Sequence, residues 1–392
     1  MTAPATKTRS QRRPRYLNPF EGRKKPINLT GLFLFDPEVS MRLRGQSVRT
    51  TFIEMGEESL FKGLERAGRT GQVTQALRGR FLDLLPPATA EALAAAFDSP
   101  DSPTNAFAQM GMWEAHLLGA LRDDNGQPVE WPASAQFLCD VERASRQATM
   151  LFDEGQFQAA AQYLAGHSLL RRFMSPESLH GLAQPLHPND RLAIRTGVAL
   201  EVWLSLLALW DIEAGADDVD DDHSFIEQLL PPDDNTAKNT VAQLFDWLLK
   251  SAKVATPAAI MKDPRLKAFG VQIGTLGAWS RGTNFPSASY GTAIANALLS
   301  AENAATFKRL SAAARQLNFL GYVAQHIKTV VGTLEGAKAE QAKHLGLGLP
   351  FGHDDIEAWI RCRYPVWLKV HRANLAGKAP GEAAAAAAAA AQ

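Results

Sequence analysis

Apolar residues recur at helical spacing in segment after segment of this 392-residue chain, and this pattern constrains the fold most. Between residues 133 and 170, for example, steps of three or four residues place one set of apolar side chains near a single helix face: Phe137, Val141, Ala144, Ala148 and Leu151. No run shows the sustained alternation of apolar and polar residues that a half-buried strand requires. The sequence therefore predicts an all-α, mostly helical globular protein.

Several expected helices begin with capping residues. Ser175-Pro176-Glu177 combines a good N-cap with a proline at the first helical position, and Ser300 precedes a long helical pattern. Asp36-Pro37-Glu38 has the same form and is expected to open the first helix. Further helices are expected over residues 107–121, 133–170, 188–214, 235–254, 264–279, 301–334, 354–362 and 365–375, and the Gly/Ser/Thr-rich stretch 270–291 is expected to be irregular.

The most apolar stretch runs from Val198 to Ile212 and contains two acids, Glu201 and Asp211. About fifteen residues are too few to cross a bilayer, so we interpret this stretch as a buried core helix. The tryptophans fall mostly on apolar helical stripes, where core packing is expected and a subunit interface is the alternative.

Breakers and composition divide the chain into four parts. Proline-rich turns at residues 98–103 and 123–132 suggest a soft boundary near residue 130. We expect a flexible basic arm over residues 1–28, a helical N-terminal region over 29–130, a main helical body over 131–377 and a low-complexity tail over 378–392. The tail contains nine consecutive alanines and is expected to be disordered or a frayed helix.

The charge of the chain is unevenly distributed. Through Lys25 there are eight basic residues against one acid, Glu21, so this arm carries +7 and the rest of a neutral chain carries −7. Cations neutralise phosphates without needing a fixed geometry, and an aromatic ring among them can stack on a base. The expected nucleic-acid-binding residues are Lys7, Arg9, Arg12, Arg13, Arg15, Tyr16, Arg23, Lys24 and Lys25. The alternatives for the arm are a solvated tail, a localisation signal, or a role at a protein or membrane surface. Tyr16, Leu17 and Phe20 could instead anchor the arm on the body or on a neighbouring subunit.

An acidic cluster over residues 217–222 (Asp-Asp-Val-Asp-Asp-Asp) is the strongest candidate for metal chemistry, because Mg²⁺ prefers oxygen ligands. Over these six residues it resembles the aspartate-rich motif of class I terpene synthases, which implies a magnesium-dependent enzyme. The second metal motif of that family does not follow at the expected spacing. A solvated loop, or a patch that meets a basic surface, is the alternative interpretation.

Other catalytic patterns are absent from the sequence. Neither a phosphate-binding loop nor the HExxH and GxSxG patterns occur, and two distant cysteines exclude a disulfide framework. The basic N-terminus is not followed by the apolar segment of a secretory signal. We therefore expect no enzyme activity, no cofactor, no resident metal and no membrane partner, with a cytoplasmic location, or a virion if the protein is viral.

A basic arm on a slightly acidic helical body matches the layout of a self-assembling coat or nucleocapsid protein. In that layout the arm neutralises packaged RNA or DNA, with RNA favoured over DNA, while the neutral total charge lets like bodies approach. A helical adaptor whose arm docks on a larger complex, and a magnesium-dependent enzyme that uses the acidic cluster, remain the alternatives.

Overall fold

The computed structural model confirms the all-α class. It describes residues 15–18, most of 29–35 and 52–84, and then 133–213, 225–231, 239–331 and 337–376, with short gaps inside these ranges and a few single positions between them. In these residues the only strands are β1 (Leu29–Thr30) and β2 (Leu34–Phe35), which pair antiparallel. The longer helices are α3 (Glu58–Thr70), α7 (Ala133–Asp153), α8 (Phe157–Gly166), α10 (Pro188–Glu213), α11 (Thr240–Ser251), α14 (Ala288–Leu298), α15 (Ala301–Val331) and α17 (Ile356–Leu375).

Shorter helices complete the described fold. They are α4 (Gln75–Leu82), η1 (Leu170–Phe173), α9 (Pro176–Leu182), η3 (Phe225–Gln228), α12 (Pro257–Ile260), α13 (Ile273–Ser280), α16 (Ala337–His344) and η5 (Pro350–Gly352). The chain divides into two compact units. We call residues 22–224 with 323–392 the larger unit, and residues 1–21 with 225–322 the smaller unit.

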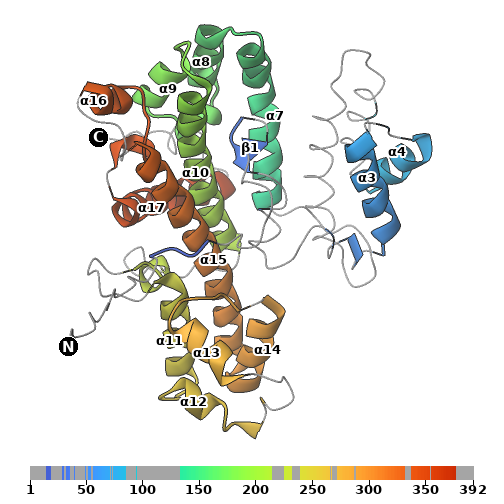
Figure 1. The fold of residues 1–392 in the computed structure, drawn as a ribbon, viewed down its shortest axis with the longest axis vertical. Coiled ribbons are helices and arrows are strands. Elements are labelled where there is room, and N and C mark those ends of the chain that lie inside the picture. Colours follow the sequence, from blue (N-terminus) through green and yellow to red (C-terminus); the bar gives the residue numbers. More distant parts are fainter. Residues whose placement is uncertain are drawn as a thin grey trace, which may run out of the picture. The chain divides into compact units, whose positions relative to one another are not determined.

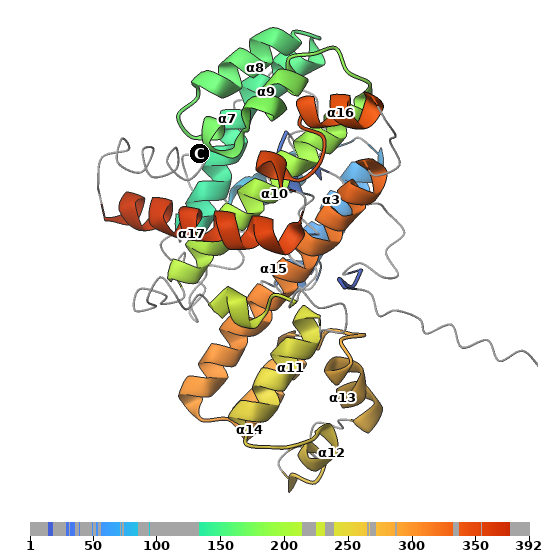
Figure 2. The same ribbon diagram turned by 90° about the vertical axis from the view of Figure 1, so that its left-hand side faces the viewer.

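Helix α10 is the core of the larger unit. It packs against α7, α9 and α17, and α17 crosses it as Figures 1 and 2 show. Neighbours on several sides explain why the segment 197–209 is buried without interruption and why its sequence is apolar except for Glu201 and Ser205. Among the described residues α10 alone is long and apolar enough to cross a bilayer, and 78% of its most apolar window is buried inside the structure. The expectation of a buried core helix is therefore confirmed by its packing, whereas the argument from length was wrong, because α10 has 26 residues.

The smaller unit is built around α11 and the first part of α15. Trp279 of α13 lies edge-on to Phe245 of α11, with ring centroids 6.0 Å apart, and Trp247 stacks on Phe307 of α15 at 6.3 Å. The residues expected to share one face of α15, namely Leu310, Ala314, Leu317, Gly321 and Ala324, are all buried. Helical periodicity thus predicted the packing face of this helix correctly.

Two predicted helix starts are confirmed by their caps. The Ser175 hydroxyl accepts a hydrogen bond from the Ser178 N–H at 3.1 Å, with Pro176 at the first position of α9. The Ser300 hydroxyl accepts from the Asn303 N–H at 3.3 Å and begins α15. Each hydroxyl satisfies a backbone donor that the first helical turn leaves free.

Three segments differ from the sequence-based expectation. The helical pattern over 133–170 forms α7, α8 and η1, because Gly155 adopts a φ of +76° and turns the chain between α7 and α8. The stretch 270–291, expected to be irregular, contains α13 and the start of α14, which bury Leu276 and Trp279 against their neighbours. The two helices expected on either side of Pro365 are one helix, α17, with the proline inside it.

Other expectations fall on residues outside those described. They are the helix over 107–121, the boundary near residue 130, the acidic cluster 217–222, the alanine tail and seven cations of the arm. The two compact units themselves divide at residues 21/22, at 224/225 and within α15 at 322/323. The expectations for the residues outside those described stay as predictions.

Candidate functional site

Only two of the nine predicted nucleic-acid-binding residues, Arg15 and Tyr16, lie among the described residues. Arg15 is half-buried and has an interaction partner. Tyr16 is buried, with 3% of its surface exposed. A base needs a free ring face for stacking, so the inclusion of Tyr16 as a stacking residue does not fit its position, and the alternative role of anchor does.

The anchor, which we define as Tyr16 with Leu17, is held on helix α15 of the smaller unit. The Leu17 N–H donates to the Asn318 side-chain oxygen at 2.8 Å, and the Asn318 amide donates back to the Leu17 carbonyl at 2.8 Å. Asn318 is fully buried, so this pair satisfies its amide inside the protein. The Tyr16 ring lies on Gly321, where any Cβ atom would collide with ring carbons. A glycine inside a long helix therefore forms the seat for the anchor.

A buried charged cluster joins α10 to α17 in the larger unit. The Glu201 carboxylate is fully buried and accepts three hydrogen bonds, from Trp359 Nε1 at 2.9 Å, Arg363 Nε at 2.7 Å and Trp367 Nε1 at 2.7 Å. Arg363 is 3% exposed, and its guanidinium also lies over the Phe351 ring at 3.9 Å. A buried ion pair becomes tolerable when its polar atoms gain further bonds, and here both Glu201 oxygens accept hydrogen bonds from tryptophan side chains.

Two more polar pairs link the same helices. The Tyr364 hydroxyl donates to Asp211 at 2.6 Å, and Ser205 Oγ shares a hydrogen bond of 2.8 Å with His371 Nε2. Burial lowers the pKa of His371 to about 4, and a hydrogen bond to the Ser205 backbone opposes this effect only in part. His371 is therefore neutral at physiological pH.

The sequence contained an overlooked signal for this cluster. Trp359, Arg363, Trp367 and His371 follow one another at steps of four residues, so they share one face of α17. An acid within an otherwise apolar helix, Glu201, needed a buried partner of opposite charge. Pairing these two observations would have predicted the contact between α10 and α17.

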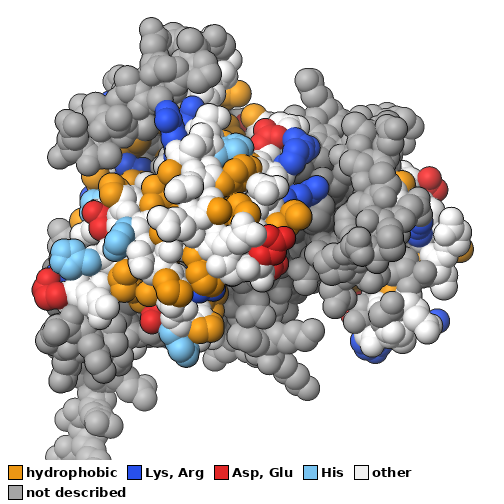
Figure 3. Space-filling model, turned by 90° about the horizontal axis from the view of Figure 1, so that it is seen from above, with side chains coloured by type: hydrophobic (Ala, Val, Ile, Leu, Met, Phe, Trp, Pro, Cys, Tyr) orange, Lys and Arg blue, Asp and Glu red, His pale blue; other side chains and the backbone are white. Residues whose placement is uncertain are grey.

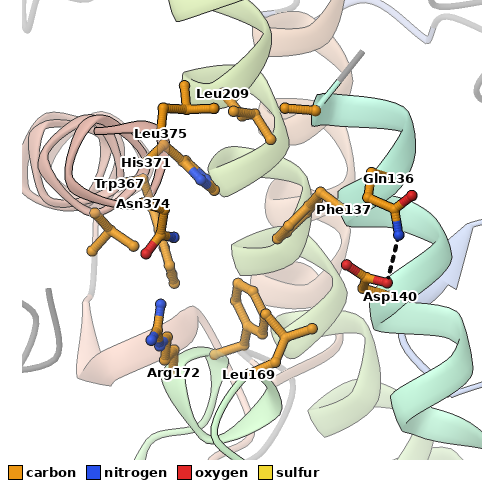
Figure 4. Close-up of a pocket in the computed structure, with 13 residues that line it drawn as sticks. Gln136, Phe137, Asp140, Leu169, Arg172, Leu209, Trp367, His371, Asn374 and Leu375 are labelled. Carbon is orange, nitrogen blue, oxygen red and sulfur yellow. Dashed lines mark hydrogen bonds between the residues drawn. The ribbon is translucent and has the colours of Figure 1, made fainter. Parts of the chain in front are cut away.

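A pocket of about 220 Å³ opens beside this cluster, between α7, η1, α10 and the last turns of α17 (Figure 4). Phe137, Phe173 and Trp367 contribute aromatic walls, and Trp367 stacks on Phe173 with ring centroids 4.9 Å apart. His371 and Arg172 are the basic groups of its lining. Burial lowers the pKa of Arg172, and the neighbouring Arg171 contributes in the same direction.

Within the described residues no group of three or more His, Cys, Asp or Glu side chains could hold a metal ion. The acidic cluster 217–222 lies outside that part of the chain, so the magnesium hypothesis stays a prediction.

Comparisons with known proteins add no relative: no family model, no curated protein and no solved structure matches this chain.

Proposed function

We propose that this protein is a structural, nucleic-acid-associated protein that self-assembles, of the coat or nucleocapsid type, and that its basic arm neutralises packaged RNA or DNA. The observation that supports this most is the anchor of Tyr16 and Leu17 on α15. An anchor directly after a run of cations ties those cations to the helical body, as an arm that attaches nucleic acid to a protein shell requires.

The reach of the arm follows from covalent geometry. Lys7, Arg9, Arg12 and Arg13 precede Tyr16 by three to nine residues. A fully extended chain spans at most about 3.6 Å per residue, so the Cα atoms of these four residues stay within roughly 32 Å of the Tyr16 Cα atom. Arg23, Lys24 and Lys25 follow the anchor in the sequence, so basic residues precede and follow it along the chain.

The surface of the larger unit favours the arm over the body as the phosphate-binding element. Figure 3 looks onto the end formed by α8 and α9, where basic and acidic side chains are interspersed among hydrophobic ones. A phosphate backbone is best attracted by a stripe of one sign. The described part of this face has no such stripe, whereas the arm carries +7 over its first 25 residues.

The experiment is a titration of fluorescein-labelled single-stranded RNA, followed by anisotropy at several salt concentrations. The test variant replaces Lys7, Arg9, Arg12 and Arg13 with Gln and leaves the anchor intact. The control variant removes the same charge from four exposed body positions, Arg69, Arg146, Lys308 and Lys369.

We expect the arm variant to lose at least tenfold in affinity, and its plot of log K against log salt to become less steep by about 3, since each lost contact with a single strand contributes about 0.7. The body variant should change both quantities much less. Equal affinity and slope for the arm variant and the unaltered protein would refute the proposal. No RNA binding by the unaltered protein would also refute it, and would favour the adaptor interpretation.

A further inference from the structure

The pocket beside the buried cluster contains a cation, Arg172, that pairs with no acid among the described residues. Arg172 is half-buried, and its Nε atom is buried with no hydrogen-bond partner among the described residues. Its side chain extends from η1 into the space between α7 and α17 (Figure 4). Partial burial of an unpaired guanidinium disfavours its charged form, and a bound anion would remove this penalty.

The remaining walls favour an apolar ring next to that anion. Phe137 comes from α7, Phe173 from η1 and Trp367 from α17, so an aromatic cluster built from three elements lines one side of the pocket. An apolar cavity of about 150 Å³ holds benzene. The 220 Å³ found here therefore fits a ring with a short charged substituent.

The other titratable groups of the pocket, Asp140 and His371, have partners of their own. Asp140 accepts hydrogen bonds from Gln136 at 2.8 Å and from Arg143 at 3.1 Å, and Arg143 offsets its charge. His371 is bonded to Ser205, and the positive charge of Arg172 helps to keep it neutral. Arg172 is thus the group of the described pocket that is free to receive an anion.

We propose that this pocket binds a small aromatic carboxylate, with the carboxylate on Arg172 and the ring against the cluster of Phe137, Phe173 and Trp367. Arg is suited to this role because its planar group can donate two parallel hydrogen bonds to a carboxylate. The site lies wholly in the larger unit and does not depend on the arm or on nucleic acid.

The test is isothermal titration calorimetry of the full chain with phenylacetate as the probe. Phenylacetamide has the same shape without the charge, and acetate has the charge without the ring. The test variant is Arg172→Gln. The matched control is Arg171→Gln, which removes the same charge from the exposed neighbouring position. A thermal melt of both variants checks that the fold is kept.

We expect phenylacetate to bind at least tenfold more tightly than phenylacetamide or acetate. Arg172→Gln should weaken phenylacetate at least tenfold, while Arg171→Gln should change it less than twofold. No heat of phenylacetate binding up to 10 mM, equal affinity for the acid and the amide, or equal loss in both variants would each overturn the proposal. If Arg172→Gln fails to fold, the comparison of phenylacetate with phenylacetamide and acetate on the unaltered protein still decides it.

Discussion

Replacement of Glu201 by Gln should destabilise the larger unit far more than the small change in side-chain volume suggests. In the structure Oε1 accepts from both Arg363 and Trp367, and Oε2 accepts from Trp359. A glutamine can keep an oxygen at only one of these two positions. At the other position its NH₂ group would face an N–H donor, and the guanidinium of Arg363 would lose its counter-charge.

The magnitude follows from the burial of the pair. Glu201 and Arg363 have side chains that are 0% and 3% exposed, so solvent cannot replace the lost partner. Removal of one member of such a pair costs about 3–5 kcal/mol because the other charge stays buried. With a urea m-value of about 2–3 kcal/mol/M, the unfolding midpoint of the larger unit should fall by about 1–2.5 M.

Urea unfolding followed by tryptophan fluorescence measures this change, since Trp359 and Trp367 contact Glu201 directly. Asp140→Asn is the control, because its ion pair with Arg143 is solvent-exposed and should contribute less than about 1 kcal/mol. In the double variant with Arg363→Met, the loss should be clearly smaller than the sum of the two single losses. A loss below 1 kcal/mol for Glu201→Gln, or strict additivity in the double variant, would refute the reasoning.

Three further predictions concern single residues. His371 has a pKa of about 4 in the folded state and 6.5 in the unfolded state. Its contribution to stability is therefore complete above pH 6.5 and is lost as the pH falls to 4, by up to about 3 kcal/mol. Urea unfolding at several pH values should show a smaller loss of stability at low pH in His371→Gln, and an unchanged pH profile would contradict this. Gly321→Ala should displace the Tyr16 ring, so trypsin should cut after Arg15 faster than in the unaltered protein. Mass spectrometry measures the cleavage rate, and equal rates in the two proteins would contradict the proposed anchor. Gly282→Ala should lower the melting temperature of the smaller unit by an amount equivalent to about 2 kcal/mol, because φ is +64° and the new Cβ would meet the Asn239 side chain that caps α11. Its control is Gly274→Ala, where nothing lies within 4 Å, and equal effects of the two changes would contradict the prediction.

The helices that were predicted well are those with strong local signals. Ser175-Pro176 and Ser300 specify helix starts through their own side chains, and the five-residue apolar face of α15 follows from periodicity alone. The apolar run at 198–212 likewise predicted a core helix. In these places local propensity and tertiary packing agree.

The errors occur where packing overrides local signals. Pro365 removes a backbone N–H and disfavours a helix interior, but Trp359 and Arg363 before it and Trp367 after it all bond to Glu201. These bonds hold both halves of α17 in one line. Residues 270–291 form helices despite their glycines because Trp279 and Leu276 are buried against neighbouring helices.

The candidate sites also depend on tertiary packing that the sequence does not predict. Charge counting located the basic arm, but only the structure distinguished the buried Tyr16 anchor from an exposed ring. The residues that line the pocket lie between positions 133 and 375, far apart in the sequence, so no short sequence motif predicts the pocket. Arg172 and Trp367 line the same pocket only because α17 packs beside η1.

The central claim is that the basic arm binds nucleic acid and that the bodies assemble around it. Light scattering of the purified protein, with absorbance at 260 and 280 nm before and after nuclease and high salt, tests it most directly. We predict large particles that contain nucleic acid and that become smaller when nuclease and salt remove it. A monomer with a protein-like absorbance ratio, unchanged by either treatment, would contradict the account.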